Sequence, residues 1–327
     1  MTYTSVEIGF PGLGIDSFIV DRAAFSVGGH PVMWYGIIIA IGMMVAVGYV
    51  MFRTRRYKGI IADDVLDFAI FVVLFGVIGA RLYYVLTSGH NYSFGEIFAI
   101  WEGGLAIYGG IIFGAATAVA VCLVKKIRPQ CFCDMLAPAV MIAQAIGRWG
   151  NFMNGEAHGG ETASFLRMEL SHLYENGVSQ YIGAVHPTFL YESLWNLLGF
   201  ILINIFYNKR KFDGQITLTY FAWYGFGRMF IEGLRTDSLY VGPFRISQVV
   251  GLLSFLISTA ALIYFLKKGK RYASASYKDE PKEKGLFARI FGETAVTEES
   301  VEDTESDDDY VPIADGEKDA KKDENNG

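Results

Sequence analysis

The sequence predicts an all-α, polytopic membrane protein with seven transmembrane helices, an N-terminus outside the membrane and a C-terminus in the cytoplasm. Two observations predict this class. Hydrophobic residues make up 52% of the 327 residues, and the mean hydropathy of +0.30 is too high for an average soluble protein. Basic residues are also concentrated in every second loop between the apolar runs, which is the asymmetry that orients membrane proteins.

Each predicted helix is an apolar run of about 20 residues, the length that crosses a bilayer core. The runs are 32–52, 65–86, 105–124, 134–153, 187–207, 214–234 and 246–266. The segment at about 154–186 is predicted to be an external loop. The first apolar run is too long for the hydrophobic region of a signal peptide, so we expect no cleavable signal peptide.

Basic residues give these runs a direction. The loops after the first, third, fifth and seventh runs are basic, and they contain Arg53, Arg55, Arg56, Lys58, Lys125, Lys126, Arg128, Lys209, Arg210, Lys211, Lys267, Lys268, Lys270 and Arg271. The opposite side carries Arg22, Arg167, Arg235 and Arg245. Because loops rich in lysine and arginine stay in the cytoplasm, the N-terminus is predicted to be outside.

The C-terminal segment has a different composition. Acidic residues strongly outnumber basic ones after residue 279, and aromatic residues are few. Such a segment cannot bury a hydrophobic core. The sequence therefore predicts a membrane domain over residues 1–271 and an acidic, disordered cytoplasmic tail over residues 272–327.

Cysteine and histidine patterns predict neither a metal site nor a cofactor. The three cysteines, Cys122, Cys131 and Cys133, are odd in number and form no disulfide framework. Glu156 and His158 are two positions apart, so they do not share a helix face, and further ligands are absent from this stretch.

Polar residues gather near the same end of the first six runs. Arg81, Arg148 and Arg228 lie near the ends of the three runs that travel outward, within about 10 Å of the outer end at about 1.5 Å per residue. The inward runs carry polar or aromatic residues near their starts, namely Trp34, Tyr35, Tyr108, His186, Tyr191 and Glu192. The sequence thus predicts a polar layer just below the outer surface.

Two simpler interpretations compete with a functional site. Arginines near helix ends can snorkel to the interface on their own, and Trp34 and Tyr35 fit an aromatic belt. The arginines are nevertheless accompanied by carboxylates and an amide, Asn151, Glu156, Glu192 and Glu232. Anchoring does not require these companions.

Several guanidinium groups in the outer leaflet suit a phosphate, which arginine binds in a bidentate manner. Phospholipid headgroups are the phosphates available there, so membrane lipid is an expected partner. The glutamates and Tyr108 are candidates to accept a proton. The sequence contains no H-E-x-x-H motif and no P-loop, so common metalloprotease and NTPase mechanisms lack their residues.

Five motifs carry a family resemblance. "GRWGNFMNGEAHGG" (147–160), "WEGGLAIYGG" (101–110), "HPTFLYE" (186–192), "MWYG" (33–36) and "RMFIEGLR" (228–235) resemble the prolipoprotein diacylglyceryl transferase family, in that family's order. The resemblance covers about residues 20 to 270, and the acidic tail lies outside it. The family has seven spans and an external N-terminus.

The resemblance implies a transfer reaction in the bacterial cytoplasmic membrane. The diacylglyceryl group of phosphatidylglycerol passes to the lipobox cysteine of a prolipoprotein signal peptide, and glycerol phosphate leaves. This is the first step of lipoprotein maturation. It implies no cofactor and no nucleic-acid partner.

The resemblance also implies site residues. Arg148 and Arg228 match the key arginines of the family, and Glu156 belongs to its signature. The remaining matching positions, expected to bind substrate, are Tyr35, Asn151, Gly159, His186, Tyr191, Glu232 and Arg235, and Arg81 joins them from the polar layer.

Tyr108 departs from the family pattern. Many members carry histidine there, proposed as the base for the incoming thiol, and a tyrosine with a pKa of about 10 is a poor base at neutral pH. Either Tyr108 orients a group, or Glu156 or His186 accepts the proton.

Two other classes of protein remain as alternatives. A membrane lipid or solute transporter places charge near the midplane and often contains repeated halves, whereas these charges lie toward one face. A lipid-binding protein without catalysis is the second alternative.

Overall fold

Eight α-helices account for most of the part of the chain that the computed structural model describes, residues 3–55, 60–90, 92–99 and 103–268. They are α1 (Trp34–Thr54), α2 (Ala62–Thr87), α3 (Phe94–Phe98), α4 (Ile107–Val124), α5 (Pro129–Asn154), α6 (Thr188–Phe206), α7 (Gln215–Leu234) and α8 (Ile246–Lys268). The predicted tail, 272–327, lies outside the described residues, as do Arg56, Lys58, Lys270 and Arg271.

Six helical segments within the described residues are long and apolar enough to cross a membrane, which confirms a mostly helical, polytopic membrane protein. They are α1, α2, α4, α5, α8 and the segment Thr188–Lys209, in which a 3-10 turn continues α6. The sixth predicted run, 214–234, is also a helix, α7, but it is not among these six. Arg228 and Glu232 lower its hydropathy, and it packs against α5, α6 and α8.

The expectation of an all-α protein needs correction, because the structure contains antiparallel strands. Four of them form a sheet in the order β2-β1-β5-β6, from β1 (Tyr3–Phe10), β2 (Ile15–Asp21), β5 (Met168–Tyr174) and β6 (Ser179–Val185). The other pairs are β3 (Ala23–Val27) with β4 (His30–Met33) and β7 (Tyr240–Val241) with β8 (Phe244–Arg245). The predicted loop at 154–186 therefore contains β5 and β6.

The four-stranded sheet has its own small core. Val6, Ile8 and Leu170 are fully buried, and Ile8 pairs with Leu170 across β1 and β5. These residues pack against Phe189 at the start of α6. Short strands with one buried face alternate apolar and polar residues, so a search for long apolar runs does not detect them.

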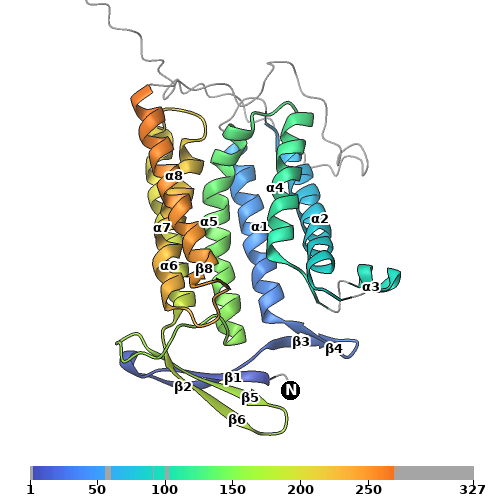
Figure 1. Ribbon diagram of the computed structural model, residues 1–327, viewed down its shortest axis with the longest axis vertical. Helices are drawn as coiled ribbons and strands as arrows, with labels where there is room; N and C mark the ends of the chain where they lie inside the picture. Colours follow the sequence, from blue (N-terminus) through green and yellow to red (C-terminus); the bar gives the residue numbers. More distant parts are fainter. Residues whose placement is uncertain (1–2, 56–59, 91, 100–102, 269–327) are drawn as a thin grey trace, which may run out of the picture. The chain divides into compact units, whose positions relative to one another are not determined.

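The long helices pack in pairs, and Figure 1 shows them side by side with the sheet below one end. α1 packs mainly on α5, α2 on α4 and α7 on α8, whereas few contacts join α1 to α2 or α4 to α5. The α2–α4 pair is close because Gly109 has no side chain. A Cβ at that position would lie 2.3 Å from the carbonyl oxygen of Gly79, as expected where small residues let helices approach.

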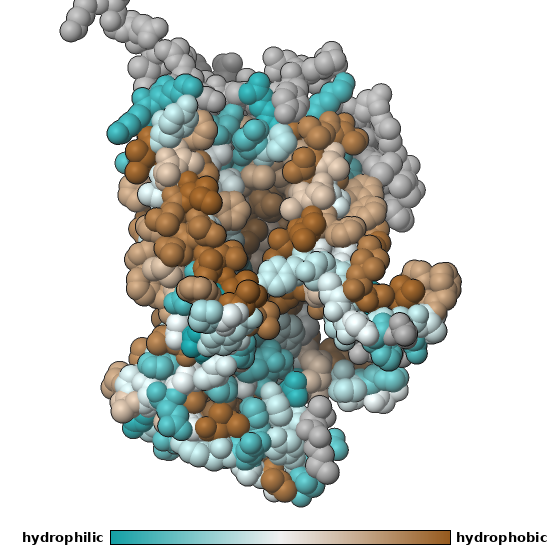
Figure 2. Space-filling model, viewed as in Figure 1, coloured by the Kyte–Doolittle hydropathy of each residue, from teal (hydrophilic) through white to brown (hydrophobic). Residues whose placement is uncertain are grey.

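Hydrophobic surface covers the middle of the helices, and hydrophilic residues cover the sheet (Figure 2). At the helix ends far from the sheet, a second core joins α1, α2, α4 and α5. It contains Val50, Val65, Phe68, Cys122 and Phe132. The α2–α4 pair is thus attached to the other helices mainly at that end.

Candidate active site

A cavity of about 750 Å³ lies among α1, α2 and α5, a size typical of ligand pockets. Most of its wall is apolar. Its polar end lies where α5 and α7 finish, on the side of the sheet (Figure 1). The polar residues described there are Tyr35, Gln144, Arg148, Asn151, Glu156, Arg228, Arg235 and Asp237.

Glu192 joins two arginines from different helices. Its Oε1 lies 2.6 Å from Nη2 of Arg148 on α5, and its Oε2 lies 2.8 Å from Nη1 of Arg228 on α7. Glu192 itself is on α6 and is 2% exposed. A buried carboxylate that accepts from two guanidinium groups holds both of them in one orientation. The sequence placed Glu192 in the polar layer among the glutamates that could accept a proton, and the structure shows it as the shared partner of two arginines.

A second set of ion pairs continues along α7. Nη2 of Arg228 lies 2.5 Å from Oε2 of Glu232, one helical turn later. Arg235, just after α7, donates to both carboxylate oxygens of Asp237, at 2.9 and 2.7 Å. Burial alone raises the pKa of Asp237, but the hydrogen bonds and charge of Arg235 outweigh it, so its pKa is lower than usual. Sequence analysis missed Asp237, although it follows Arg235 by two positions.

The arginines face the cavity, and two of their carboxylate partners lie behind them. Arg148, Arg228 and Arg235 line the cavity. Glu192 and Glu232 are each 2% exposed and are not among its described lining residues. This arrangement leaves guanidinium N–H groups available to a ligand while the buried carboxylates offset part of the charge.

The end of α5 brings the carboxylate of Glu156 to the same cavity, which Asp237 also lines. Asn151 accepts from Nη1 of Arg148 at 3.0 Å and donates to Oε1 of Glu156 at 3.0 Å. The helix ends at Asn154, and the next residue, Gly155, has a φ of 61°, the left-handed conformation that glycine adopts readily. After this turn, Glu156 lies within hydrogen-bonding distance of Asn151, which in turn contacts Arg148.

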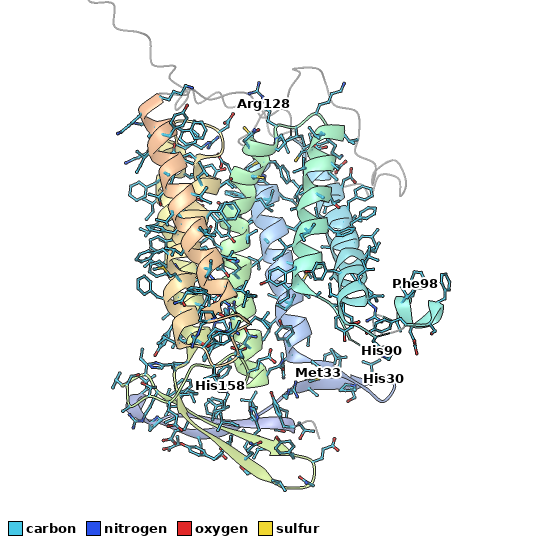
Figure 3. The ribbon with its side chains drawn as sticks, in the orientation of Figure 1. His30, Met33, His90, Phe98, Arg128 and His158 are labelled. Carbon is cyan, nitrogen blue, oxygen red and sulfur yellow. The ribbon has the colours of Figure 1, made fainter. Side chains whose placement is uncertain are left out.

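The next residues are held between the start of α6 and the end of α7. Gly159 donates to the carbonyl of His186 at 2.9 Å, and Gly160 donates to the carbonyl of Leu234 at 2.9 Å. Thr188 hydrogen-bonds the carbonyl of Ala157. A Cβ at Gly159 would lie 2.7 Å from Cβ of His186, so this close approach requires glycine. His158 consequently lies in the loop between the helices and the sheet (Figure 3).

Besides Gly159 and Glu232, four of the expected site residues are not among the described residues that line the cavity, namely Arg81, Tyr108, His186 and Tyr191. His186 and Tyr191 contact each other, with Nδ1 3.3 Å from the tyrosine hydroxyl. Tyr108 is 41% exposed on α4. Arg81 donates to four backbone carbonyls of the segment before α4, those of Glu96, Ile97, Gly103 and Gly104, at 2.6 to 3.1 Å. Arg81 therefore secures that segment.

Among the described residues, no group of three or more His, Cys, Asp or Glu side chains is arranged to hold a metal ion. The ionic groups at the cavity are instead guanidinium and carboxylate groups in mutual contact. Such an arrangement can bind an anion through the arginines and accept a proton through a carboxylate.

Comparisons with known proteins agree with the motifs of this site. The model of the family described as prolipoprotein diacylglyceryl transferase matches residues 22–264. A phosphatidylglycerol–prolipoprotein diacylglyceryl transferase of Clostridium perfringens is 42% identical over 271 residues, which cover 82% of this chain and 99% of that protein. Enzymes of the same name from Listeria welshimeri and Staphylococcus aureus are 44% and 43% identical, covering 75% and 77% of this chain and 90% and 91% of those proteins. The chain belongs to the prolipoprotein diacylglyceryl transferase family.

Proposed function

We propose that this chain transfers the diacylglyceryl group of phosphatidylglycerol to the lipobox cysteine of a prolipoprotein, at the polar end of the cavity. The observation that carries this proposal is the position of the arginines. Arg148, Arg228 and Arg235 line a cavity whose remaining wall is mostly apolar. A phospholipid has the matching distribution, an anionic phosphate joined to apolar chains.

The arginines bind the phosphate and stabilise its departure. The cysteine sulfur attacks the glyceryl carbon that carries the phosphate ester. A carbon–sulfur bond forms as the carbon–oxygen bond breaks, and glycerol phosphate leaves with the bonding electron pair. Negative charge grows on the leaving oxygen, so guanidinium groups already fixed by Glu192 stabilise the transition state without reorganising. Asn151 and Glu232 keep the two arginines in place.

Glu156 is the group that accepts the thiol proton in this proposal. It lines the cavity beside Arg148 and is oriented by Asn151. Asp237 also lines the cavity, but its lowered pKa makes it a weaker base. His186 and Tyr108 are not among the described lining residues, and Tyr35 supports the substrate from α1.

The total of seven membrane spans and the orientation of the chain belong to the same proposal. We assign α7 as a membrane-crossing helix, although Arg228 and Glu232 lower its hydropathy. An odd number of spans then places the two termini on opposite sides of the membrane, and the basic loops assign the N-terminus to the outside and the C-terminus to the cytoplasm. The arginines lie at the outer face of the bacterial cytoplasmic membrane, residues 1–271 form the enzyme, and the tail at 272–327 is dispensable for turnover.

The decisive experiment uses purified full-length chain, phosphatidylglycerol and a lipobox peptide. We expect the peptide to gain a diacylglyceryl group, detected as a mass increase, with stoichiometric release of glycerol phosphate. A lipobox peptide with Ser in place of Cys is the control and must remain unmodified. Lipid binding without product identifies a lipid-binding protein, and lipid counterflow into liposomes without product identifies a transporter. Either outcome refutes the proposal.

A further inference from the structure

The cavity extends from its charged end along one face of α1, toward the helix ends that are far from the sheet. Tyr35, Ile39, Met43, Val47 and Val50 all line it. They recur every three or four positions, which places them on one helix face. At about 1.5 Å per residue, this face extends roughly 22 Å from the polar end. The cavity is therefore a deep apolar channel whose charged residues are confined to one end.

The channel has a closed floor. Phe132 of α5 and Phe68 of α2 line its far end, with ring centroids 4.3 Å apart. Val50 and Val65 line the same end, and all four side chains are at most 6% exposed. They also form part of the buried core that joins α1, α2, α4 and α5. Packed aromatic side chains of this kind cannot move aside without disrupting that core.

The depth of the channel matches an acyl chain. The apolar stretch of α5 from Gln144 to Phe132 is about 18 Å long at 1.5 Å per residue. The hydrocarbon of one bilayer leaflet is about 15 Å thick, half of a core of about 30 Å. A lipid with its phosphate at Arg148 thus brings the end of an extended acyl chain close to Phe132.

We propose that Phe68 and Phe132 limit the length of the acyl chain that the enzyme accepts. This inference rests on the proposed function, because the occupant of the channel is the phosphatidylglycerol bound by the arginines. A chain that ends above the floor is buried fully. A longer chain must bend or leave methylene groups outside the channel. Each methylene group that is not buried lowers kcat/KM by up to about fourfold.

The test moves the floor and measures the chain-length profile. Ala69 lines the channel next to Phe68, so Ala69→Phe raises the floor by filling space that is already empty. Phe68→Leu lowers the floor, because leucine is smaller than phenylalanine. Ala120 lies on the exposed surface of α4 and is not among the described lining residues. Ala120→Phe therefore adds the same volume outside the channel and serves as the control.

Each full-length variant is assayed with lipobox peptide and with dilauroyl, dipalmitoyl or diarachidoyl phosphatidylglycerol. We expect Ala69→Phe to lower kcat/KM for diarachidoyl lipid at least tenfold more than it lowers kcat/KM for dilauroyl lipid. This is the combined effect of leaving two or more methylene groups unburied. Phe68→Leu is expected to raise kcat/KM for the longest lipid relative to dilauroyl lipid. Ala120→Phe is expected to keep the chain-length profile of the wild-type protein. Ala46→Phe, which fills the channel from α1, makes the same test from the facing wall if Ala69→Phe does not fold.

The results separate the two proposals. If the wild-type protein transfers every lipid but all variants keep parallel profiles, the floor does not limit chain length, and the proposed function stands. If the wild-type protein transfers no lipid at any chain length, the proposed function fails, and the assignment of an acyl chain to the channel fails with it.

Discussion

Oε1 of Glu192 lies 2.6 Å from Nη2 of Arg148, although the two residues are 44 positions apart. The pair joins α5 to α6, and the other oxygen of the same carboxylate reaches Arg228. Glu192 is therefore expected to act through the two arginines. Glu192→Gln keeps the size of the side chain but removes its charge, so two guanidinium groups lose their shared counter-ion. Breaking a buried pair in this way costs about 3–5 kcal/mol of stability.

We expect Glu192→Gln to lower both the thermal midpoint and the turnover of phosphatidylglycerol. Glu192→Asp is the matched variant, because it keeps the charge and shortens the reach. It is expected to recover stability better than activity, since the arginines are then held in a different position. A Glu192→Gln enzyme with normal stability and normal turnover would contradict the bridging role.

Arg148 and Arg81 provide a comparison between an arginine at the cavity and one away from it. Arg148→Lys keeps the charge but loses the planar fork that binds two oxygens at once, so we expect turnover to fall by about 10² or more. Arg81→Lys removes backbone hydrogen bonds from the segment before α4, so it is expected to reduce the thermal midpoint more than turnover. Equal losses of turnover at matched stability would refute the distinction.

The proton acceptor can be identified by two conservative substitutions. Glu156→Gln keeps the hydrogen bond to Asn151 possible but removes the basic oxygen. We expect its turnover to fall by roughly 10²–10⁴, the contribution of a general base. Tyr108→Phe is expected to cost less than tenfold, because Tyr108 is on α4 and outside the described cavity wall. The reverse ranking in single-turnover assays would assign the proton transfer to Tyr108.

Gly159 and Gly160 are adjacent glycines with different surroundings. A Cβ at Gly159 meets His186 at 2.7 Å and the carbonyl of Leu234 at 2.9 Å, whereas a Cβ at Gly160 meets nothing within 4 Å. Gly159→Ala is therefore expected to cost about 1–3 kcal/mol of stability and to displace Arg235, which follows Leu234. Gly160→Ala is the control and is expected to retain turnover and thermal midpoint. Similar behaviour of both variants would show that the close approach at Gly159 is not needed.

Membrane orientation is tested with reporter fusions. A reporter after Lys211 is expected to read cytoplasmic, because it follows an inward span and lies in a basic loop. A reporter inserted at Asn176, an exposed turn residue between β5 and β6, is expected to read external. Both reporters on the same side would exclude the proposed arrangement of seven spans.

Much of the helical structure follows from the sequence alone. Long apolar runs leave no alternative to helices, because a helix satisfies its own backbone hydrogen bonds in lipid. All seven predicted runs are helical in the structure. Family membership was also available from the order of the motifs, since residues such as Arg148, Asn151 and Glu156 occur at characteristic spacings.

Tertiary structure decided which polar residues act together. Arg81, Arg148 and Arg228 are equivalent in the sequence, each near the end of a run, yet Arg81 binds backbone carbonyls while the other two share Glu192. Similarly, β1 pairs with β5 through residues as far apart in sequence as Tyr3 and Tyr174, and no local pattern specifies such a partner. A charged or strand-forming residue can satisfy its hydrogen bonds in several ways, and only the packing of α5, α6 and α7 selects one of them.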